Sequence, residues 1–200
     1  MGKEADSILQ EMEDAIMELP HGFSIKGKRF RLYPISLGKS MLLSRLLQEL
    51  GINFDLLGKH PAMEALRIAS SGKDIVCRII AYCTAKDRYE VFDAVKIADR
   101  QSFFIENLST EEAAQLLLVV CQYDKAASFI KYLGLDKEQS EQTNISKLKN
   151  KNGNSVIFGG KSLYGSLIGI ACEKFGWTLD YVVWGISLVN LRMMIADGIN

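Results

Sequence analysis

The chain has little of what most enzyme active sites are built from. Its 200 residues include only two histidines and three prolines. His21 and His60 each lie next to a proline, so neither is placed to share a helical turn with a nearby acid as a metal ligand. Neither Gly-x-Ser-x-Gly nor His-Glu-x-x-His occurs in the sequence. These absences favour a protein that is not an enzyme, with no catalytic residues, no metal and no cofactor.

Cysteine pairs, long apolar runs and an excess charge are also missing. None of the four cysteines (Cys77, Cys83, Cys121, Cys172) belongs to a Cys-x-x-Cys pair, so we interpret them as buried small hydrophobic residues in a reducing compartment. The N-terminus is acidic and does not resemble a signal peptide. The longest apolar run, residues 181–196, is interrupted by polar residues, which argues against a membrane span. We therefore expect a cytoplasmic protein without membrane contact.

The net charge argues against nucleic acid as a general partner. Lys and Arg number 24 and Asp and Glu number 24, so the formal net charge is zero. A nucleic-acid binder needs a basic surplus to displace counterions from the phosphates. The zero is a sum of unequal parts, because residues 1–19 carry six acids against one lysine, while residues 21–31 carry four basic residues and no acid.

What the chain does have is helical periodicity. Hydrophobic residues make up 48% of the sequence, which is enough to bury a core. Apolar side chains recur at helical spacing in six segments before residue 135, namely 8–19, 37–50, 61–69, 75–83, 89–105 and 116–133. In the fifth segment, Val91, Phe92, Val95 and Ile97 are the expected inward positions. Ser109 and Glu112 form a capping box that predicts the start of the sixth helix.

Residues 23–33 change from helical to alternating periodicity. Phe23 and Ile25 alternate with polar residues, as do Phe30 and Leu32, and Gly27 can take the positive φ of a tight turn. The segment therefore predicts a β-hairpin. All its charges are basic (Lys26, Lys28, Arg29, Arg31), which is compatible either with a small phosphate- or acid-binding patch or with a solvated hairpin face.

Two short stretches, residues 37–40 and 159–162, contain the Gly-Lys-Ser of a phosphate loop. That loop also needs a glycine five positions before the glycine of its Gly-Lys pair, so that backbone amides can wrap the phosphates. Tyr33 and Ser155 hold those positions. The spacing therefore argues against nucleotide binding at both places.

Residues 136–154 differ from the rest of the chain. They are polar, with Ile145 and Leu148 as the only sizeable hydrophobic residues, so burial cannot offset the entropy of ordering them. We expect a mobile linker or loop there, preceded by a helical domain (1–135) and followed by a small helical C-terminal subdomain (155–200) that opens with a short strand at 156–158. The predicted fold class is mainly α, a multi-helix domain with a short N-terminal β-hairpin and the small C-terminal subdomain.

The C-terminal subdomain carries a stripe of large apolar residues at heptad-like spacing. Both tryptophans of the chain belong to it. On one continuous helix the stripe would be either the core of the subdomain or a docking surface for a partner helix, although Gly185 and Ser187 favour a break in that helix. The candidate partner-binding residues of this stripe are Trp177, Tyr181, Trp184, Leu188, Leu191 and Ile195.

The order of these features resembles the tail assembly chaperones of long-tailed bacteriophages and prophages. The resemblance lies in the capped segment 108–112 that leads into Leu116-Leu117-Leu118, the polar linker, and the closing segment 175–184 with Ser187, Leu188 and Leu191. The early segment 23–32 followed by a Leu-rich helix is similar to the beginning of such proteins.

The resemblance implies a non-enzymatic role in virion assembly. Such chaperones coat the helical tape-measure protein through apolar helical surfaces before the tail tube polymerises around it. The implied partner is the tape-measure protein, with the tail-tube protein and a second copy of this chain left open, and the implied location is the cytoplasm of a bacterial host. Two alternatives remain: another phage structural component such as a head–tail connector, and a small DNA-binding regulator that uses the basic hairpin.

Overall fold

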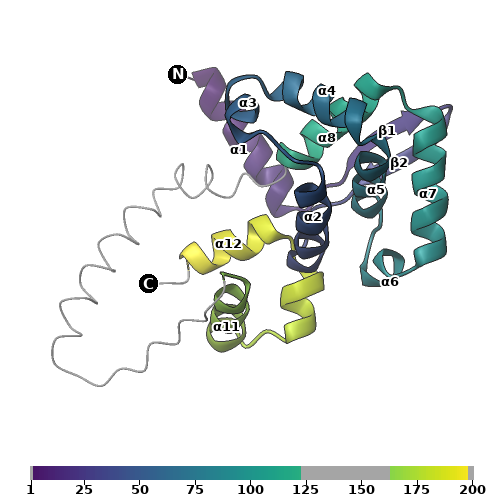
Figure 1. Cartoon of the computed structure of the whole chain (residues 1–200). Coiled ribbons are helices and arrows are strands. Elements are labelled where there is room, and N and C mark those ends of the chain that lie inside the picture. Colours follow the sequence, from purple (N-terminus) through teal and green to yellow (C-terminus); the bar gives the residue numbers. More distant parts are fainter. Residues whose placement is uncertain (1, 123–162, 198–200) are drawn as a thin grey trace. The chain divides into compact units, whose positions relative to one another are not determined.

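The computed structural model describes residues 2–122 and 163–197 (Figure 1). Within these ranges the chain is mainly helical, with one antiparallel hairpin near the N-terminus, and the predicted fold class is confirmed. The predicted linker at 136–154, the strand at 156–158 and the Gly-Lys-Ser at 159–162 lie outside the described residues. No helix among the described residues is long and apolar enough to cross a membrane.

The chain forms two compact units. Of the described residues, 2–17 and 163–197 belong to unit 1 and 18–122 belong to unit 2. The sequence instead predicts one helical domain over residues 1–135, which contains both the first helix and the hairpin. The first helix belongs with the C-terminal helices because Met12 is buried against Val189. In addition, the Asn190 side-chain amide donates a hydrogen bond to the Ile16 carbonyl at 3.2 Å.

The hairpin of unit 2 forms as its alternating pattern predicts. Strands β1 (His21–Ile25) and β2 (Lys28–Leu32) pair antiparallel, with Phe23 opposite Phe30. The two turn residues, Lys26 and Gly27, both have positive φ, at 49° and 78°. A turn of this hand matches the twist of the strands, and glycine adopts it without strain.

The helices of unit 2 pack around α5 and attach the hairpin to α7. The Val76, Ile79 and Ile80 side chains of α5 are fully buried, and α5 contacts both α7 and α8. The Phe30 ring of the hairpin lies 4.9 Å from the Phe104 ring of α7, centroid to centroid. The helices are α2 (Leu37–Glu49), α3 (Phe54–Lys59), α4 (Pro61–Ser71), α5 (Lys73–Cys83), α6 (Arg88–Val91), α7 (Ala94–Asn107) and α8 (Thr110–Gln122).

The segment predicted as one helix over 89–105 is two helices. The first ends at Val91, and Asp93 caps the second, because the Asp93 carboxylate accepts a hydrogen bond from the Lys96 amide at 3.0 Å. Val91 and Ile97 are buried as expected, whereas Phe92 and Val95 are 62% and 70% exposed. The prediction of Phe92 and Val95 as inward residues was wrong. It assumed one continuous helix, and the break changes which residues lie on the buried side.

Two other local predictions have different outcomes. The capping box is confirmed, since the Ser109 hydroxyl accepts from the Glu112 amide at 3.1 Å and the Glu112 carboxylate accepts from the Ser109 amide at 2.8 Å. Cys77 and Cys83 are buried, and burial raises their pKa values to about 11 and about 12. Cys121, however, is exposed, so its interpretation as a buried residue was wrong. It lies one residue before the end of α8.

Unit 1 contains short elements. Besides α1 (Gly2–Ile16), it has α11 (Leu163–Phe175), a single turn of π-helix η2 (Tyr181–Gly185) and α12 (Leu188–Asp197). Helix α12 contacts both α1 and α11, so these two helices each pack against α12.

Candidate functional site

The predicted C-terminal stripe does not lie on one helix. Trp177 precedes η2, and Tyr181 and Trp184 lie within it. The helix ends at Gly185, and a new one begins after Ser187, whose hydroxyl accepts a hydrogen bond from the Asn190 amide at 3.2 Å. The break that Gly185 and Ser187 favour in the sequence is therefore present, and the six residues cannot form a straight heptad seam.

The two halves of the stripe differ in burial. Leu191 and Ile195 lie in the core of unit 1, and Leu188 is half-buried. Among the aromatic residues, Trp177 and Trp184 are half-buried and Tyr181 is 43% exposed. The second half of the stripe therefore packs as core, while the first half still presents surface to solvent.

The exposed half is organised by contacts between rings. The Phe175 and Trp177 ring centroids are 4.8 Å apart, and the Trp177 and Tyr181 rings meet edge to face at 5.2 Å. Such contacts hold aromatic side chains in fixed positions. Leu179, between them in sequence, is 60% exposed. We call Phe175, Trp177, Leu179 and Tyr181 the aromatic ladder.

Gly185 holds the Tyr181 end of the ladder in place by having no side chain. A Cβ at position 185 would lie 2.5 Å from the Tyr181 Cδ2 atom, which is closer than real Cβ contacts come. The ring of Tyr181 therefore lies directly against the Gly185 backbone. The same glycine both ends the π-helical turn and sets the position of an exposed aromatic ring.

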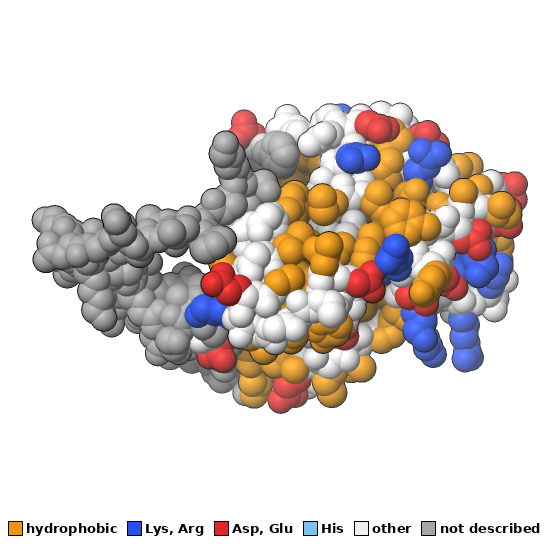
Figure 2. Space-filling model, turned by 90° about the horizontal axis from the view of Figure 1, so that it is seen from below, with side chains coloured by type: hydrophobic (Ala, Val, Ile, Leu, Met, Phe, Trp, Pro, Cys, Tyr) orange, Lys and Arg blue, Asp and Glu red, His pale blue; other side chains and the backbone are white. Residues whose placement is uncertain are grey.

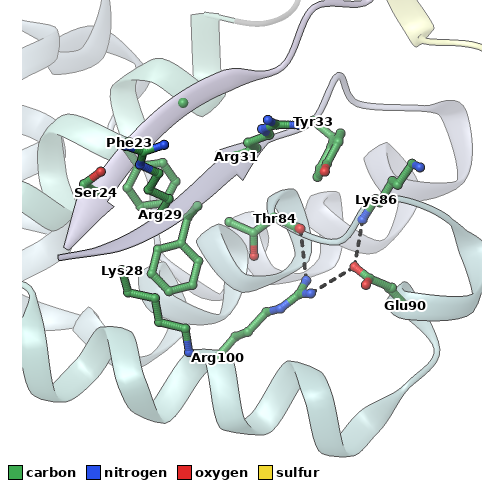
Figure 3. Close-up of a pocket in the computed structure, with 12 residues that line it drawn as sticks. Phe23, Ser24, Lys28, Arg29, Arg31, Tyr33, Thr84, Lys86, Glu90 and Arg100 are labelled. Carbon is green, nitrogen blue, oxygen red and sulfur yellow. Dashed lines mark hydrogen bonds and ion pairs between the residues drawn. The ribbon is translucent and has the colours of Figure 1, made fainter. Parts of the chain in front are cut away.

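A second surface lies on unit 2, where the hairpin faces α5, α6 and α7 (Figure 3). It is a cavity of about 720 Å³ with a basic lining. The basic residues come from β2, from the α5–α6 connection and from α7, and Glu90 is the one acidic residue in the lining. The cationic cavity is lined by Gly22, Phe23, Ser24, Lys28, Arg29, Phe30, Arg31, Tyr33, Thr84, Lys86, Glu90 and Arg100.

The base of the cationic cavity is held by a hydrogen-bonded network (Figure 3). The Arg100 guanidinium donates to the Thr84 carbonyl and to the Glu90 carboxylate, both at 2.9 Å, and the same carboxylate accepts from the Lys86 amide at 3.0 Å. Although burial alone would raise it, the pKa of Glu90 lies below its usual value because of the Lys86 and Arg100 hydrogen bonds. The Glu90 carboxylate is therefore already paired with Arg100 in the cavity wall. It does not neutralise the basic residues of β2, which remain available to an anionic ligand.

The two arginines of β2 have small cross-strand neighbours. Arg29 lies opposite Ser24 and Arg31 opposite Gly22. Both arginines are exposed. Lys28 is positioned differently, since its ammonium lies 4.9 Å from the Phe103 ring centroid. The four hairpin cations noted in the sequence are therefore not equivalent, and Arg29 and Arg31 have the most room for a partner.

Beside the cavity, unit 2 exposes apolar side chains. Tyr89 is 85% exposed, and with Phe92 and Val95 it forms an apolar corner between α6 and α7. The first of these three residues lies on α6, the same short helix as Glu90 of the cavity wall. Figure 2 shows basic side chains projecting at the right-hand edge, which in Figure 1 carries the hairpin and α7, with apolar side chains next to them.

The first Gly-Lys-Ser stretch is part of the core. Lys39 is buried, its ammonium donates to the Ala85 carbonyl just beyond the end of α5, and it lies 5.7 Å from the Tyr33 ring centroid. Burial lowers the pKa of Lys39. The lysine therefore closes the end of a helix, in agreement with the failed phosphate-loop spacing.

Sequence reasoning missed a buried carboxylate in unit 2. Glu64 on α4 is fully buried and accepts hydrogen bonds from the Arg67 Nε and Nη2 atoms at 2.8 and 2.7 Å and from the Asn53 amide at 2.7 Å. Arg67 also donates to the Gly51 carbonyl at 2.9 Å. The hydrogen bonds from Arg67 lower the pKa of Glu64 to about 2. The Glu64–Arg67 pair connects α4 to the α2–α3 connection through hydrogen bonds. In the sequence, the Glu-x-x-Arg spacing is the only sign of this pair.

Neither of the two histidines is among the residues that form these surfaces. His21 begins β1 and His60 lies between α3 and α4, and both are exposed. Within residues 2–122 and 163–197, no group of histidines, cysteines and acids could hold a metal ion. Comparison with known proteins adds no relative, since no family model, no curated protein and no solved structure matches the chain.

Proposed function

We propose that the chain is a non-enzymatic tail assembly chaperone of a bacteriophage or prophage. In this role it binds the helical tape-measure protein before the tail tube polymerises around it. The proposal rests on the resemblance carried by residues 108–118 and 175–191. It is supported by a mainly helical fold whose exposed aromatic residues are held in a fixed arrangement.

The aromatic ladder is the observation that carries the proposal. Its rings contact one another, and Leu179 and Tyr181 remain well exposed. Aromatic residues dominate the energy of protein interfaces, and positioned rings lose little conformational entropy on binding. An apolar stripe on a partner helix could pack against this ladder and be shielded from solvent until the tube replaces it.

Co-purification with the tape-measure protein tests the proposal. The two proteins are expressed together, and the chain is then captured with and without Leu179→Ser and Tyr181→Ser together. We expect the wild type to retain the tape-measure protein in soluble form, and the double variant to lose most of it. Met63→Ser is the matched control, because Met63 is equally exposed but lies on unit 2.

Three outcomes would contradict the proposal. One is a wild-type chain that neither binds the tape-measure protein nor keeps it soluble. A stable ring of the chain alone would favour a head–tail connector instead. A gel shift with duplex DNA at low salt, where phosphate contacts are strongest, would favour a regulator. Circular dichroism of the double variant separates lost binding from lost folding.

A further inference from the structure

We propose that the cationic cavity and the apolar corner together bind an acidic amphipathic helix of a protein partner. The inference rests on the proposed function in one respect, namely that the partner is a helical protein. It adds a second contact on unit 2, with a chemistry different from that of the aromatic ladder.

The charges of the cavity select an acidic ligand. Five of its lining residues are basic and one is acidic, and that acid is already paired with Arg100. Guanidinium groups bind carboxylates in a planar, two-pronged geometry. Arg29 and Arg31 are both exposed and have small neighbours across the hairpin, so a carboxylate can approach either of them.

The spacing of the two arginines fits a helix. Residues two apart on a strand are separated by about 6.6 Å. Residues four apart on a helix are separated by about 6 Å along its axis. Acids at positions i and i+4 of a partner helix can therefore pair with Arg29 and Arg31 together.

The apolar corner argues for a protein rather than a nucleic acid. Tyr89, Phe92 and Val95 are each more than half exposed, and an apolar face of a helix would bury them. A nucleic-acid strand could stack on the two rings but would gain nothing from Val95.

A defined peptide tests the inference. The probe is a labelled synthetic helix of about 20 residues, long enough to be helical in water, built of Leu, Ala and Glu with the acids at i and i+4 beside a Leu face. Its affinity is measured by fluorescence anisotropy against the full chain. The comparison peptide has Lys in place of Glu. We expect the Glu peptide to bind and the Lys peptide not to.

Charge reversal on the hairpin locates the site. Arg29→Glu with Arg31→Glu should weaken binding of the Glu peptide about tenfold, because two attractive pairs become repulsive. Arg29→Gln with Arg31→Gln keeps the side chains polar and should give a smaller loss in the same direction. Arg45→Glu with Lys59→Glu is the matched control, since both residues are exposed and lie outside the cavity.

A separate pair tests the apolar corner. Phe92→Ser with Val95→Ser should weaken the Glu peptide about five- to tenfold, since two exposed apolar contacts are lost. Circular dichroism and thermal unfolding show whether each variant is folded.

Several outcomes overturn the inference. Equal binding of the Lys peptide, or an equal loss in the Arg45/Lys59 control, would show that the charges of the cavity do not select the ligand. An oligo-dT strand that binds more tightly than the peptide, and is lost only in the arginine variants, would assign the cavity to nucleic acid. If the peptide fails while tape-measure co-purification persists, only this inference is overturned. If the peptide binds but co-purification fails, the proposed function is overturned instead.

Discussion

Replacing Gly185 by alanine is the sharpest test of how the aromatic ladder is built. The added Cβ would lie 2.5, 3.1 and 3.2 Å from the Cδ2, Cε2 and Cγ atoms of Tyr181. All three atoms belong to the ring itself, so a small adjustment at the end of the side chain cannot relieve the contact. The Tyr181 ring must move, and it then loses its edge-to-face contact with Trp177.

The expected change in the free energy of unfolding combines two opposing effects. Overpacking of this kind costs about 1–3 kcal/mol. Replacing a glycine at a compatible backbone position stabilises a protein by about 0.4–1 kcal/mol, because the unfolded chain loses freedom. The two ranges differ by about 0–2.6 kcal/mol, and their midpoints lead us to expect that Gly185→Ala destabilises unit 1 by about 1 kcal/mol. For a chain of this length, each kcal/mol lowers the melting temperature by about 2–4 °C.

Gly169→Ala is the matched control. Gly169 lies within α11 of the same unit, and a Cβ there would meet no atom within 4 Å. The same substitution therefore carries only the favourable effect, and we expect an increase in stability of about 0.5–1 kcal/mol. The two variants share composition and unit, and they differ only in what the new methyl group contacts.

Tryptophan fluorescence during urea unfolding measures the effect in the right place. The chain has two tryptophans: Trp184 directly precedes the substituted glycine, and Trp177 contacts the Tyr181 ring that the new methyl group meets. The signal therefore reports on unit 1 even if the two units unfold separately. The clash is tested directly by placing Gly185→Ala in a Tyr181→Ala background, where the methyl group no longer meets a ring.

Two results would refute this reasoning. The first is a Gly185→Ala variant as stable as Gly169→Ala, because the contact between the added Cβ and the Tyr181 ring would then have no energetic cost. The second is an equal loss of stability in the Tyr181→Ala background, which would place the cost in the backbone of η2 rather than in the ring.

Three further predictions concern unit 2. The pKa of Glu64 is lowered from its usual 4.5 to about 2, so its contribution to stability should be complete above pH 4.5 and lost as the pH falls toward 2; acid titration by circular dichroism should show this loss in the wild type and not in Glu64→Gln. Ser109→Ala should lower the free energy of urea unfolding by about 1 kcal/mol, because the Glu112 amide loses its acceptor, and no change would contradict the capping role. A thiol reagent at pH 8 should modify the exposed Cys121 before Cys83, and Cys83 only on unfolding; burial raises the pKa of both thiols, but Cys83 is fully buried and its pKa is raised to about 12, and mass mapping that finds Cys83 modified in the folded chain would contradict this.

Features fixed by a few neighbouring residues were predictable from the sequence. The hairpin turn requires positive φ at Gly27, and the start of α8 requires a side-chain acceptor at Ser109. Each signal lies within three or four positions of the structure it specifies. The break at Gly185 and Ser187 belongs to the same class.

Features that depend on distant contacts were not predictable in this way. Helical spacing marked Phe92 and Val95 as inward residues, yet the chain breaks between α6 and α7 at Asp93 and both residues are exposed. From the sequence alone, Glu64 resembles an ordinary surface acid. Only the fold brings the Asn53 amide, eleven residues away in the sequence, to the Glu64 carboxylate. Likewise, the sequence contains the hairpin cations, but only the fold places them in the lining of the same cavity as the Arg100–Glu90 pair.

The two proposed surfaces obtain their binding energy from different physical sources, and this difference keeps the two proposals separable. Binding to the aromatic ladder removes apolar surface from water, and ordinary salts weaken such contacts little. Binding at Arg29 and Arg31 pairs exposed charges, which are screened beyond about 10 Å at 0.1 M salt and beyond about 3 Å at 1 M. If one partner used both surfaces, raising the salt concentration should remove the contribution of the cavity first. The complex left at high salt should then be insensitive to the arginine variants and still sensitive to Tyr181→Ser.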